Sequence, residues 1–161
     1  MNINSIVDII YNLFKGDKMD ELTTKLSEQL EVDEGKKLFP YKCTAGKTTI
    51  GIGHNLDDNG ISEDVCNYIF NGDVKLVIKD VERNLPFYNE LSEPRKGVVL
   101  NMVFNMGIKK FLKFKKTINF LVKKQFVNAS LEMLDSSWSK QVGNRALRLS
   151  KQMKTDKWVI G

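Results

Sequence analysis

The sequence predicts an α+β fold in which a small β lobe lies between helices and is followed by a mostly helical lobe. Three observations carry this prediction. Apolar residues recur at helical spacing before residue 35 and again after residue 62. Between them, Thr48-Thr49-Ile50-Gly51-Ile52-Gly53 is a short segment rich in β-branched residues. The 161 residues suit one compact domain or two small lobes that share a helix.

The N-terminal segment is predicted to be a separate helix. Its apolar stripe has helical spacing and is formed by Ile3, Ile6, Val7, Ile10 and Phe14. Gly16 then signals a helix stop. We therefore assign residues 1–18 to an N-terminal helical extension and residues 19–161 to the main domain. We favour a helix that packs on the body of the protein over a membrane-surface or partner-binding helix, or an upstream start that adds little.

Helix-breaking and turn-forming residues mark the bounds of the next helix and of the β lobe. A helix is expected from Met19 or Asp20 to Glu34-Gly35. Pro40 then prevents helix continuation, because proline lacks a backbone donor and disfavours helical geometry before it. Ala45-Gly46 and Asn59-Gly60 are turn signals. The β lobe is therefore placed at about residues 36–60.

The helical lobe is placed at about residues 62–161. Ser62 is a good N-cap, and Ser92-Glu93-Pro94 marks a second helix start. The helix that follows Pro94 is apolar on most sides, which predicts burial, and Gly107 should end it. Further helices are expected near 114–124, 126–134 and 138–154.

Composition restricts the class of protein and its partners. The net charge of +5 favours anionic partners such as nucleic acid, anionic lipid or an acidic cell wall, without choosing among them. No stretch reaches the roughly 18–20 apolar residues of a membrane span. The N-terminus has no basic region and no cleavage site of a secretory signal. The cysteines, Cys43 and Cys66, are too few for a zinc site or a disulfide scaffold, and we expect two free thiols rather than a single disulfide.

Glu34 is the first candidate catalytic residue. It is expected at the carboxyl end of a helix, where a carboxylate opposes the helix macrodipole. Helix ends normally avoid this arrangement, so the residue is either an ordinary solvated glutamate or a carboxyl that donates a proton in catalysis. Local pattern alone does not decide between them.

The residues around Glu34 resemble a known family signature. The run of Glu34-Gly35, Tyr41-Lys42, Gly46 and Thr49 to His54 is similar to the T-even phage lysozymes, glycoside hydrolase family 24. That signature has Glu, eight residues, Asp or Cys, five residues and Thr. The positions here are Glu34, Cys43 and Thr49. Later matches continue the resemblance over roughly residues 20–160, and these are Asn59-Gly60-Ile61, Phe70-Asn71, Asp73-Val74, Asn101 to Gly107, Trp138 and Asn144-Arg145-Ala146.

The resemblance implies a lysozyme-like fold with an active-site cleft between the two lobes. It implies an endolysin-like muramidase that hydrolyses the β-1,4 bond between N-acetylmuramic acid and N-acetylglucosamine in peptidoglycan. Glu34 matches the general acid, and Thr49 matches the residue that holds the attacking water. Cys43 departs from the commoner Asp, although a Cys branch exists. A thiolate at Cys43 acts as a base, a nucleophile or an electrostatic stabiliser.

The resemblance also implies supporting residues. His54 should pair with Asp73, and Arg145 should lie near the catalytic acid. Phe104 is expected to line the substrate cleft, although core packing explains it equally well. Thr117 keeps the hydroxyl of a sugar-contacting position. Asn55 and Glu132 occupy two more sugar-contacting positions, but their residue types differ from the family pattern.

Partners and location follow from the same resemblance. We expect a monomer that acts on peptidoglycan, needs no cofactor or metal and binds no nucleic acid. It would be made in the host cytoplasm and act in the periplasm. A basic run is either a solvated rim, which we favour, or a source of weak contacts with anionic envelope groups, and it comprises Lys109, Lys110, Lys113, Lys115, Lys116, Lys123 and Lys124.

Two alternatives to a muramidase stay open at this point. A lytic transglycosylase uses one Glu and no bound water, and Thr49 argues against it. A peptidoglycan-binding module that has lost catalysis at Cys43 belongs to a different functional class.

Overall fold

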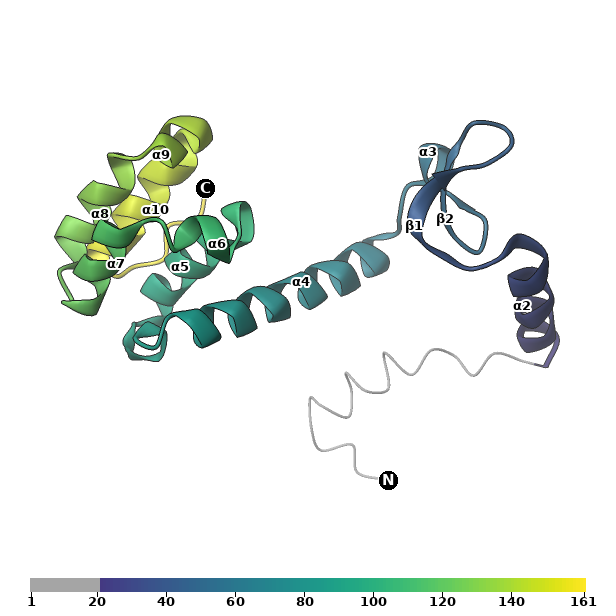
Figure 1. Cartoon of the computed structure of the whole chain (residues 1–161), viewed down its shortest axis with the longest axis horizontal. Coiled ribbons are helices and arrows are strands. Elements are labelled where there is room, and N and C mark those ends of the chain that lie inside the picture. Colours follow the sequence, from purple (N-terminus) through teal and green to yellow (C-terminus); the bar gives the residue numbers. More distant parts are fainter. Residues whose placement is uncertain (1–20) are drawn as a thin grey trace, which may run out of the picture. The chain divides into compact units, whose positions relative to one another are not determined.

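The computed structural model describes residues 21–161, and the predicted extension at 1–18 lies outside the described residues. The chain divides into two compact units, Met1–Ser62 and Glu63–Gly161 (Figure 1). We describe each unit by itself. The first contains the predicted β lobe, and the second contains the predicted helical lobe.

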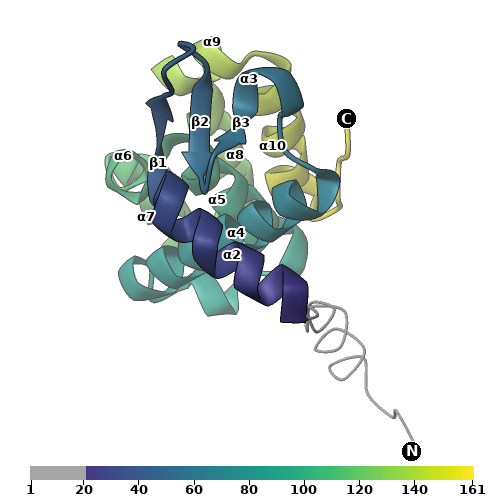
Figure 2. The ribbon, with the colours of Figure 1, turned by 90° about the vertical axis from the view of Figure 1, so that its right-hand side faces the viewer.

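The first unit joins one helix to a small sheet. Its elements are α2 (Glu21–Glu34), β1 (Lys37–Lys42), β2 (Thr48–Gly51), β3 (His54–Asn55) and α3 (Leu56–Asn59). The strands pair antiparallel in the order β1-β2-β3, with β1 and β2 side by side in Figure 2. The predicted helix end at Glu34 and the predicted antiparallel β lobe are both confirmed.

Local sequence explains the shape of the sheet. β-Branched residues form β2, where Thr49 pairs with both Tyr41 and Asn55. Pro40 lies in β1, an edge strand, where a missing backbone donor is tolerated. The β1–β2 register is irregular between Lys37 and Tyr41, on either side of this proline. The sheet thus keeps its pairing regular where Thr49 is held.

The second unit is helical, as predicted. Its elements are α4 (Glu63–Asn84), the 3-10 turn η1 (Tyr88–Glu90), α5 (Glu93–Met106), α6 (Ile108–Phe111), α7 (Lys115–Val122), α8 (Phe126–Leu134), α9 (Ser137–Val142) and α10 (Asn144–Thr155). Helix α5 has Pro94 in its first turn and Gly107 as its C-cap, as expected. The single helix predicted over 138–154 is wrong. Gly143, with φ 52° and ψ −120°, separates α9 from α10.

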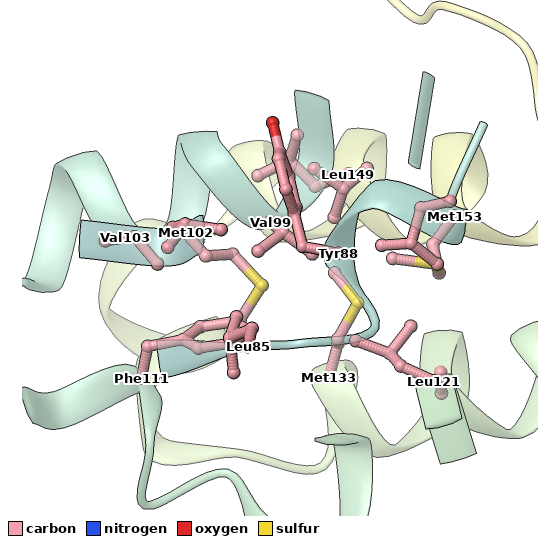
Figure 3. Packing of buried hydrophobic residues seen from close by; sticks show 14 of the residues in the cluster. Leu85, Tyr88, Val99, Met102, Val103, Phe111, Leu121, Met133, Leu149 and Met153 are labelled. Atoms are coloured by element: carbon pink, nitrogen blue, oxygen red, sulfur yellow. The ribbon is translucent and has the colours of Figure 1, made fainter. Parts of the chain in front are cut away.

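The core of the second unit is built around α5. Val98, Val99, Met102 and Val103 are each at most 2% exposed, which confirms the predicted burial of this helix. They pack with side chains from η1, α6, α7, α8 and α10, several of which are drawn in Figure 3. The Trp138 ring is also buried, and its Nε1 donates to Asn105 Oδ1 at 2.9 Å. This packing fixes the surfaces that α5 and α7 present to solvent.

Candidate active site

Glu34 is the last residue of α2, and its side chain is exposed. The chain turns directly after it, because Gly35 has a φ of 70° and its amide donates to the Glu31 carbonyl at 3.1 Å. The carboxyl lies beside the turn between β2 and β3. A β-carbon at Gly53 would stand 3.7 Å from Glu34 Oε2. The first unit alone therefore brings the predicted acid to the sheet.

Cys43 begins the loop that joins β1 to β2, and it is half-buried. Its amide donates to the Lys47 carbonyl at 3.0 Å, and Gly46 donates to the Cys43 carbonyl at 2.9 Å. The pKa of the Cys43 thiol is lowered, first by the Ala45 backbone N–H, then by the Lys47 backbone N–H and also by the Thr49 hydroxyl, while desolvation opposes them. The folded loop thus favours a thiolate at this position.

Thr49 lies next to Cys43 in space and is only 4% exposed. Its hydroxyl donates to the Lys47 carbonyl at 3.2 Å and is also within hydrogen-bonding reach of the Cys43 sulfur. A hydroxyl has one proton to donate. It therefore donates to the sulfur when Cys43 is a thiolate, and to Lys47 otherwise. Its lone pairs stay available to accept from another group.

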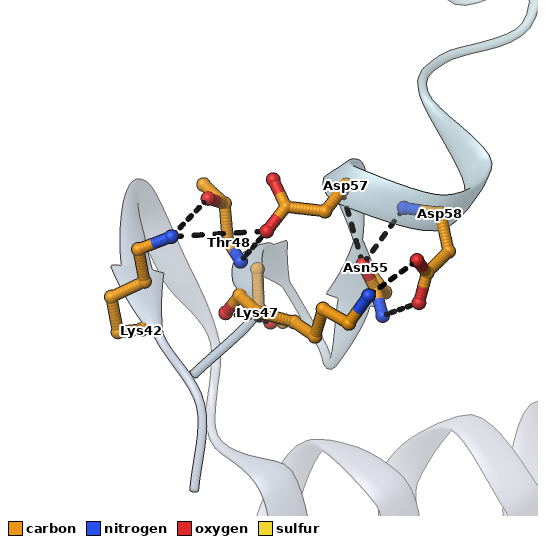
Figure 4. A network of polar contacts seen from close by, with 7 residues as sticks. Lys42, Lys47, Thr48, Asn55, Asp57 and Asp58 are labelled. Carbon is orange, nitrogen blue, oxygen red and sulfur yellow. Dashed lines mark hydrogen bonds and ion pairs between the residues drawn. The ribbon is translucent and has the colours of Figure 1, made fainter. Parts of the chain in front are cut away.

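A network of charged side chains ties the β1–β2 loop to α3 (Figure 4). Asp57 Oδ2 accepts from the Thr48 amide at 2.8 Å and lies 3.7 Å from Lys42 Nζ. Lys42 Nζ in turn donates to Thr48 Oγ1 at 2.8 Å. Lys47 Nζ and Asp58 Oδ1 form an ion pair at 2.7 Å. The loop that bears Cys43 and Thr49 is therefore held from outside the strands.

Asn55 and His54 make local contacts within the first unit. Asn55 caps α3: its Oδ1 accepts from the Asp57 and Asp58 amides, and its Nδ2 donates to Asp58 Oδ2 at 2.8 Å. His54 Nε2 lies 2.6 Å from the Gly60 carbonyl oxygen, to which the ring nitrogen donates when protonated. The expected sugar contact of Asn55 would require an amide already used in this cap.

Phe104 and Arg145 share a pocket of about 320 Å³ in the second unit. Phe104 is 44% exposed, and its ring centroid lies 5.9 Å from that of Phe70. Arg145 Nε donates to Asn101 Oδ1 at 2.8 Å. The pocket combines an aromatic wall with a hydrogen-bonded guanidinium, a lining that suits the apolar face and the hydroxyls of a sugar.

Thr117 and Glu132 line a second pocket of about 350 Å³. Thr117 is 1% exposed, and its Oγ1 is the buried side-chain oxygen or nitrogen without a hydrogen-bond partner in the part of the chain described. Glu132 lies 3.5 Å from Lys116 Nζ. The two positions that the resemblance selects thus share one pocket, together with basic side chains.

The remaining candidates divide between the units. His54 belongs to the first, and Asp73, an exposed residue of α4, belongs to the second. Both cysteines are free. Within residues 21–161 no three His, Cys, Asp or Glu side chains form a group that would hold a metal ion. The same residues include no helix that is both long and apolar enough to cross a membrane.

Comparison with known proteins decides the family. Residues 31–154, well over half of the chain, match the family described as phage lysozyme. The chain belongs to the phage lysozyme family. It is a lysozyme-type glycoside hydrolase, and peptidoglycan is its substrate. The matched residues include Glu34, Cys43 and Thr49, and all of the sheet.

Curated relatives of this chain agree with the family match. Probable T4-type lysozyme 2 of Dictyostelium discoideum is 31% identical, over 80% of this chain and 92% of the relative. Probable T4-type lysozyme 1 of the same organism is 29% identical, over 83% and 96%. The pre-baseplate central spike protein Gp5 of Enterobacteria phage T4 is 23% identical, over 81% of this chain but 28% of its own length.

Sequence reasoning did not single out the carboxylates of α3. Asp57 and Asp58 follow Asn55, and a capping residue followed by acids is a readable signal for a helix start. That signal locates the start of the helix, but it does not identify the group that the Asp57 carboxylate contacts. The contact from Asp57 to the Thr48 amide spans nine residues and depends on the fold of the β1–β2 loop.

Proposed function

We propose that this lysozyme is a muramidase that hydrolyses the β-1,4 bond between N-acetylmuramic acid and N-acetylglucosamine. The observation that carries the proposal is the arrangement in the first unit. Glu34 lies against the β2–β3 turn at Gly53, and the Cys43 thiol is surrounded by donors that favour its charged form. Glycoside hydrolysis requires these two parts, an acid and a second group that acts on water or on developing charge.

Glu34 is the proposed general acid. Its carboxyl gives a proton to the glycosidic oxygen as the bond between that oxygen and the anomeric carbon breaks. The leaving sugar departs with a free hydroxyl. Positive charge then develops at the anomeric carbon and ring oxygen of the other sugar, where water attacks. Glu34 is exposed, so a glycan can reach it without a change in the first unit.

Cys43 and Thr49 are proposed to act on the water. The thiolate accepts one water proton as the new carbon–oxygen bond forms, and the Thr49 hydroxyl holds the water by accepting from it. Attack from the face opposite the leaving group inverts the anomeric configuration. Product-anomer NMR tests this step. Retained configuration would exclude a base role for Cys43 and indicate a covalent intermediate instead.

Four further residues are proposed to bind the glycan or support the site. The Phe104 ring and the Arg145 guanidinium line one pocket, and Thr117 and Glu132 line another. Thr117 Oγ1 is buried without a partner, so a sugar hydroxyl that reached it would satisfy an otherwise costly polar atom. Thr117→Val should raise KM for glycan with little change in kcat. An unchanged KM would remove Thr117 from the binding surface.

Two lesser parts of the sequence-based prediction also remain proposals. Asn55 would contact sugar only if its amide left the α3 cap, where it accepts from two amides. The pairing of His54 with Asp73 that the resemblance implies also stays a proposal. His54→Gln and Asp73→Asn should then destabilise the protein non-additively, as measured by a double-mutant cycle in urea.

The biological role proposed is lysis of a bacterial host by a monomer that acts in the periplasm on the cell wall. Chloroform-treated Gram-negative cells give the assay, since chloroform opens the envelope. Wild type should clear the suspension, whereas Glu34→Gln should not. Mass spectrometry should find hydrated muropeptides, and anhydro products would indicate a transglycosylase. A wild type that bound peptidoglycan without clearing cells would indicate a binding module.

Lysines on α6, α7 and the loops that follow each of these helices are proposed to assist encounter with the anionic envelope. All seven are exposed, namely Lys109, Lys110, Lys113, Lys115, Lys116, Lys123 and Lys124. Exposed charges act through a screened field. Replacing Lys109, Lys110 and Lys113 by Gln should therefore reduce lysis at low salt and make it less salt-dependent. Unchanged salt dependence would leave these lysines as a solvated rim.

A further inference from the structure

The β1–β2 loop has an anchor outside its own strands. Asp57 Oδ2, on α3, accepts from the Thr48 backbone amide at 2.8 Å and lies 3.7 Å from Lys42 Nζ. Lys42 Nζ also donates to Thr48 Oγ1 at 2.8 Å. Figure 4 shows that Asp57 points from α3 toward the loop and meets Thr48 and Lys42 there. One carboxylate thus contacts groups at both ends of the loop.

Thr48, the residue that Asp57 holds, lies in the sequence between two of the residues whose groups surround the Cys43 sulfur. Thr48 is directly preceded by Lys47, whose backbone N–H stabilises the thiolate, and directly followed by Thr49, whose hydroxyl does the same. A peptide unit is planar, so fixing the Thr48 amide restricts the backbone on both sides of it. Asp57 therefore restricts the positions of both donors, although it does not contact the sulfur itself.

We propose that Asp57 is a positioning residue, which holds the Thr48 amide so that the Lys47 and Thr49 donors stay directed at Cys43. The inference rests on the catalytic role proposed above for Cys43. Asn55 supports Asp57 in turn, because its Oδ1 caps α3 by accepting from the Asp57 amide at 3.0 Å. The exposed acid at the helix start thereby becomes part of the scaffold of the site.

The charge of Asp57 and its hydrogen bond act on the thiol in opposite directions. A carboxylate near a thiolate disfavours the thiolate by repulsion, whereas a fixed set of donors favours it. The charged groups of this loop and helix are Lys42, Lys47, Asp57 and Asp58, and they form two oppositely charged pairs. Removal of Asp57 should therefore favour the Cys43 thiolate if repulsion by the carboxylate dominates, and disfavour it if fixation of the donors dominates.

The test measures alkylation of Cys43 by iodoacetamide as a function of pH. Cys66→Ser is the background, so that one thiol reacts. The thiolate is the reactive species. In Asp57→Ala we expect the profile to move to higher pH and the rate at pH 7 to fall about twofold to fivefold, because the donors are no longer fixed. A profile that stayed in place or moved to lower pH would overturn the proposal.

Two variants make the test specific. Asp57→Asn loses the charge but keeps an oxygen that accepts from Thr48, so its rate should stay within about twofold of the background. A displacement as large as that of Asp57→Ala would contradict the role of this hydrogen bond. Asp58→Ala is the matched control, since it removes the next acid of α3 and its contacts are with the Lys47 side chain and with Asn55. Its profile should not move.

A second readout links the anchor to catalysis. Asp57→Ala should lower kcat in cell-wall hydrolysis and move the acid side of the activity profile by the same amount as the alkylation profile, with KM unchanged. Unequal displacements would contradict positioning through Cys43. Alkylation needs no activity, so it tests the anchor even if Cys43→Ser proves fully active and the catalytic proposal fails. Circular dichroism of each variant confirms that the protein is folded.

Discussion

The side chain of Glu34 lies against Gly53: a β-carbon at Gly53 would stand 3.7 Å from both Cγ and Oε2 of Glu34. Gly53 belongs to the turn between β2 and β3 and has a φ of 76°. Two requirements thus meet at one glycine, a left-handed backbone and a surface on which the carboxyl rests. Glycine satisfies both because it has no side chain.

Gly53→Ala should impair catalysis as well as stability. A left-handed alanine costs roughly 1–2 kcal/mol, and the new methyl group would contact the Glu34 carboxyl. We expect kcat to fall by about threefold to tenfold, because small displacements of a catalytic group are costly. Gly60→Ala is the control, since its φ is 60° and no atom lies within 4 Å of the added β-carbon. Equal losses of kcat in both variants would show that backbone strain alone is responsible.

Replacement of Cys43 should change the rate and its pH dependence. The base works only when deprotonated, so activity should rise with pH through a thiol pKa that the Ala45 and Lys47 amides hold below its ordinary value of 9.0. Cys43→Ser should lower kcat by about 100-fold or more, the usual loss for a general base. Cys43→Asp should keep activity and move its acid limb toward about pH 4. Full activity of Cys43→Ser at every pH would exclude the thiolate from catalysis.

Gly97 and Trp158 should be energetically coupled. Gly97 lies within α5, and a β-carbon there would overlap the Trp158 ring. In a Trp158→Ala background, Gly97→Ala should stabilise the protein by about 1 kcal/mol, the gain in helix propensity. In wild type the clash should cancel or reverse that gain. Urea unfolding of the four proteins gives the coupling energy, and additivity within about 0.5 kcal/mol would contradict the contact.

Tyr88 should make the protein sensitive to alkali. Burial raises the pKa of its hydroxyl above 10.0, and Glu93 and Glu82 add to this effect. Above pH 10 the unfolded chain loses this proton and the folded chain keeps it, so stability falls as pH rises through the raised pKa. The slope approaches about 1.4 kcal/mol per pH unit. Tyr88→Phe should flatten the decline of Tm, whereas exposed Tyr68→Phe should not; equal profiles would exclude Tyr88 as the cause.

Much of the fold was predictable because its signals are local. The cluster of β-branched residues in β2 and the nearly continuous apolar run of α5 are both visible in the sequence itself. The helix break at Gly143 was not predictable from the sequence. Apolar periodicity continues on both sides of it, and a glycine inside a helix costs only about 1 kcal/mol. The break depends on a positive φ at Gly143, and its amide still bonds to the Ser139 carbonyl. Tertiary packing decides such a case.

The candidate site was predictable where residue type and spacing carried it. Glu34, Cys43 and Thr49 follow a fixed spacing, and the structure places Thr49 beside the Cys43 sulfur. The environment of that sulfur was not predictable, since it consists of backbone amides whose direction depends on the loop. The Asp57 anchor was missed for the same reason. Its partner is the Thr48 amide, and every residue except proline has such a donor.

The most direct test of the central claim is glycan hydrolysis by Glu34→Gln, which keeps the size of the side chain and removes its acid. Reducing ends released from purified peptidoglycan should fall by about 100-fold to 10,000-fold, the usual contribution of a general acid, while Tm and binding to the wall are retained. If glycan hydrolysis were lost in Glu34→Gln but retained in Cys43→Ser, the enzyme would need only the acid. Hydrolysis by Glu34→Gln at the wild-type rate would contradict the account.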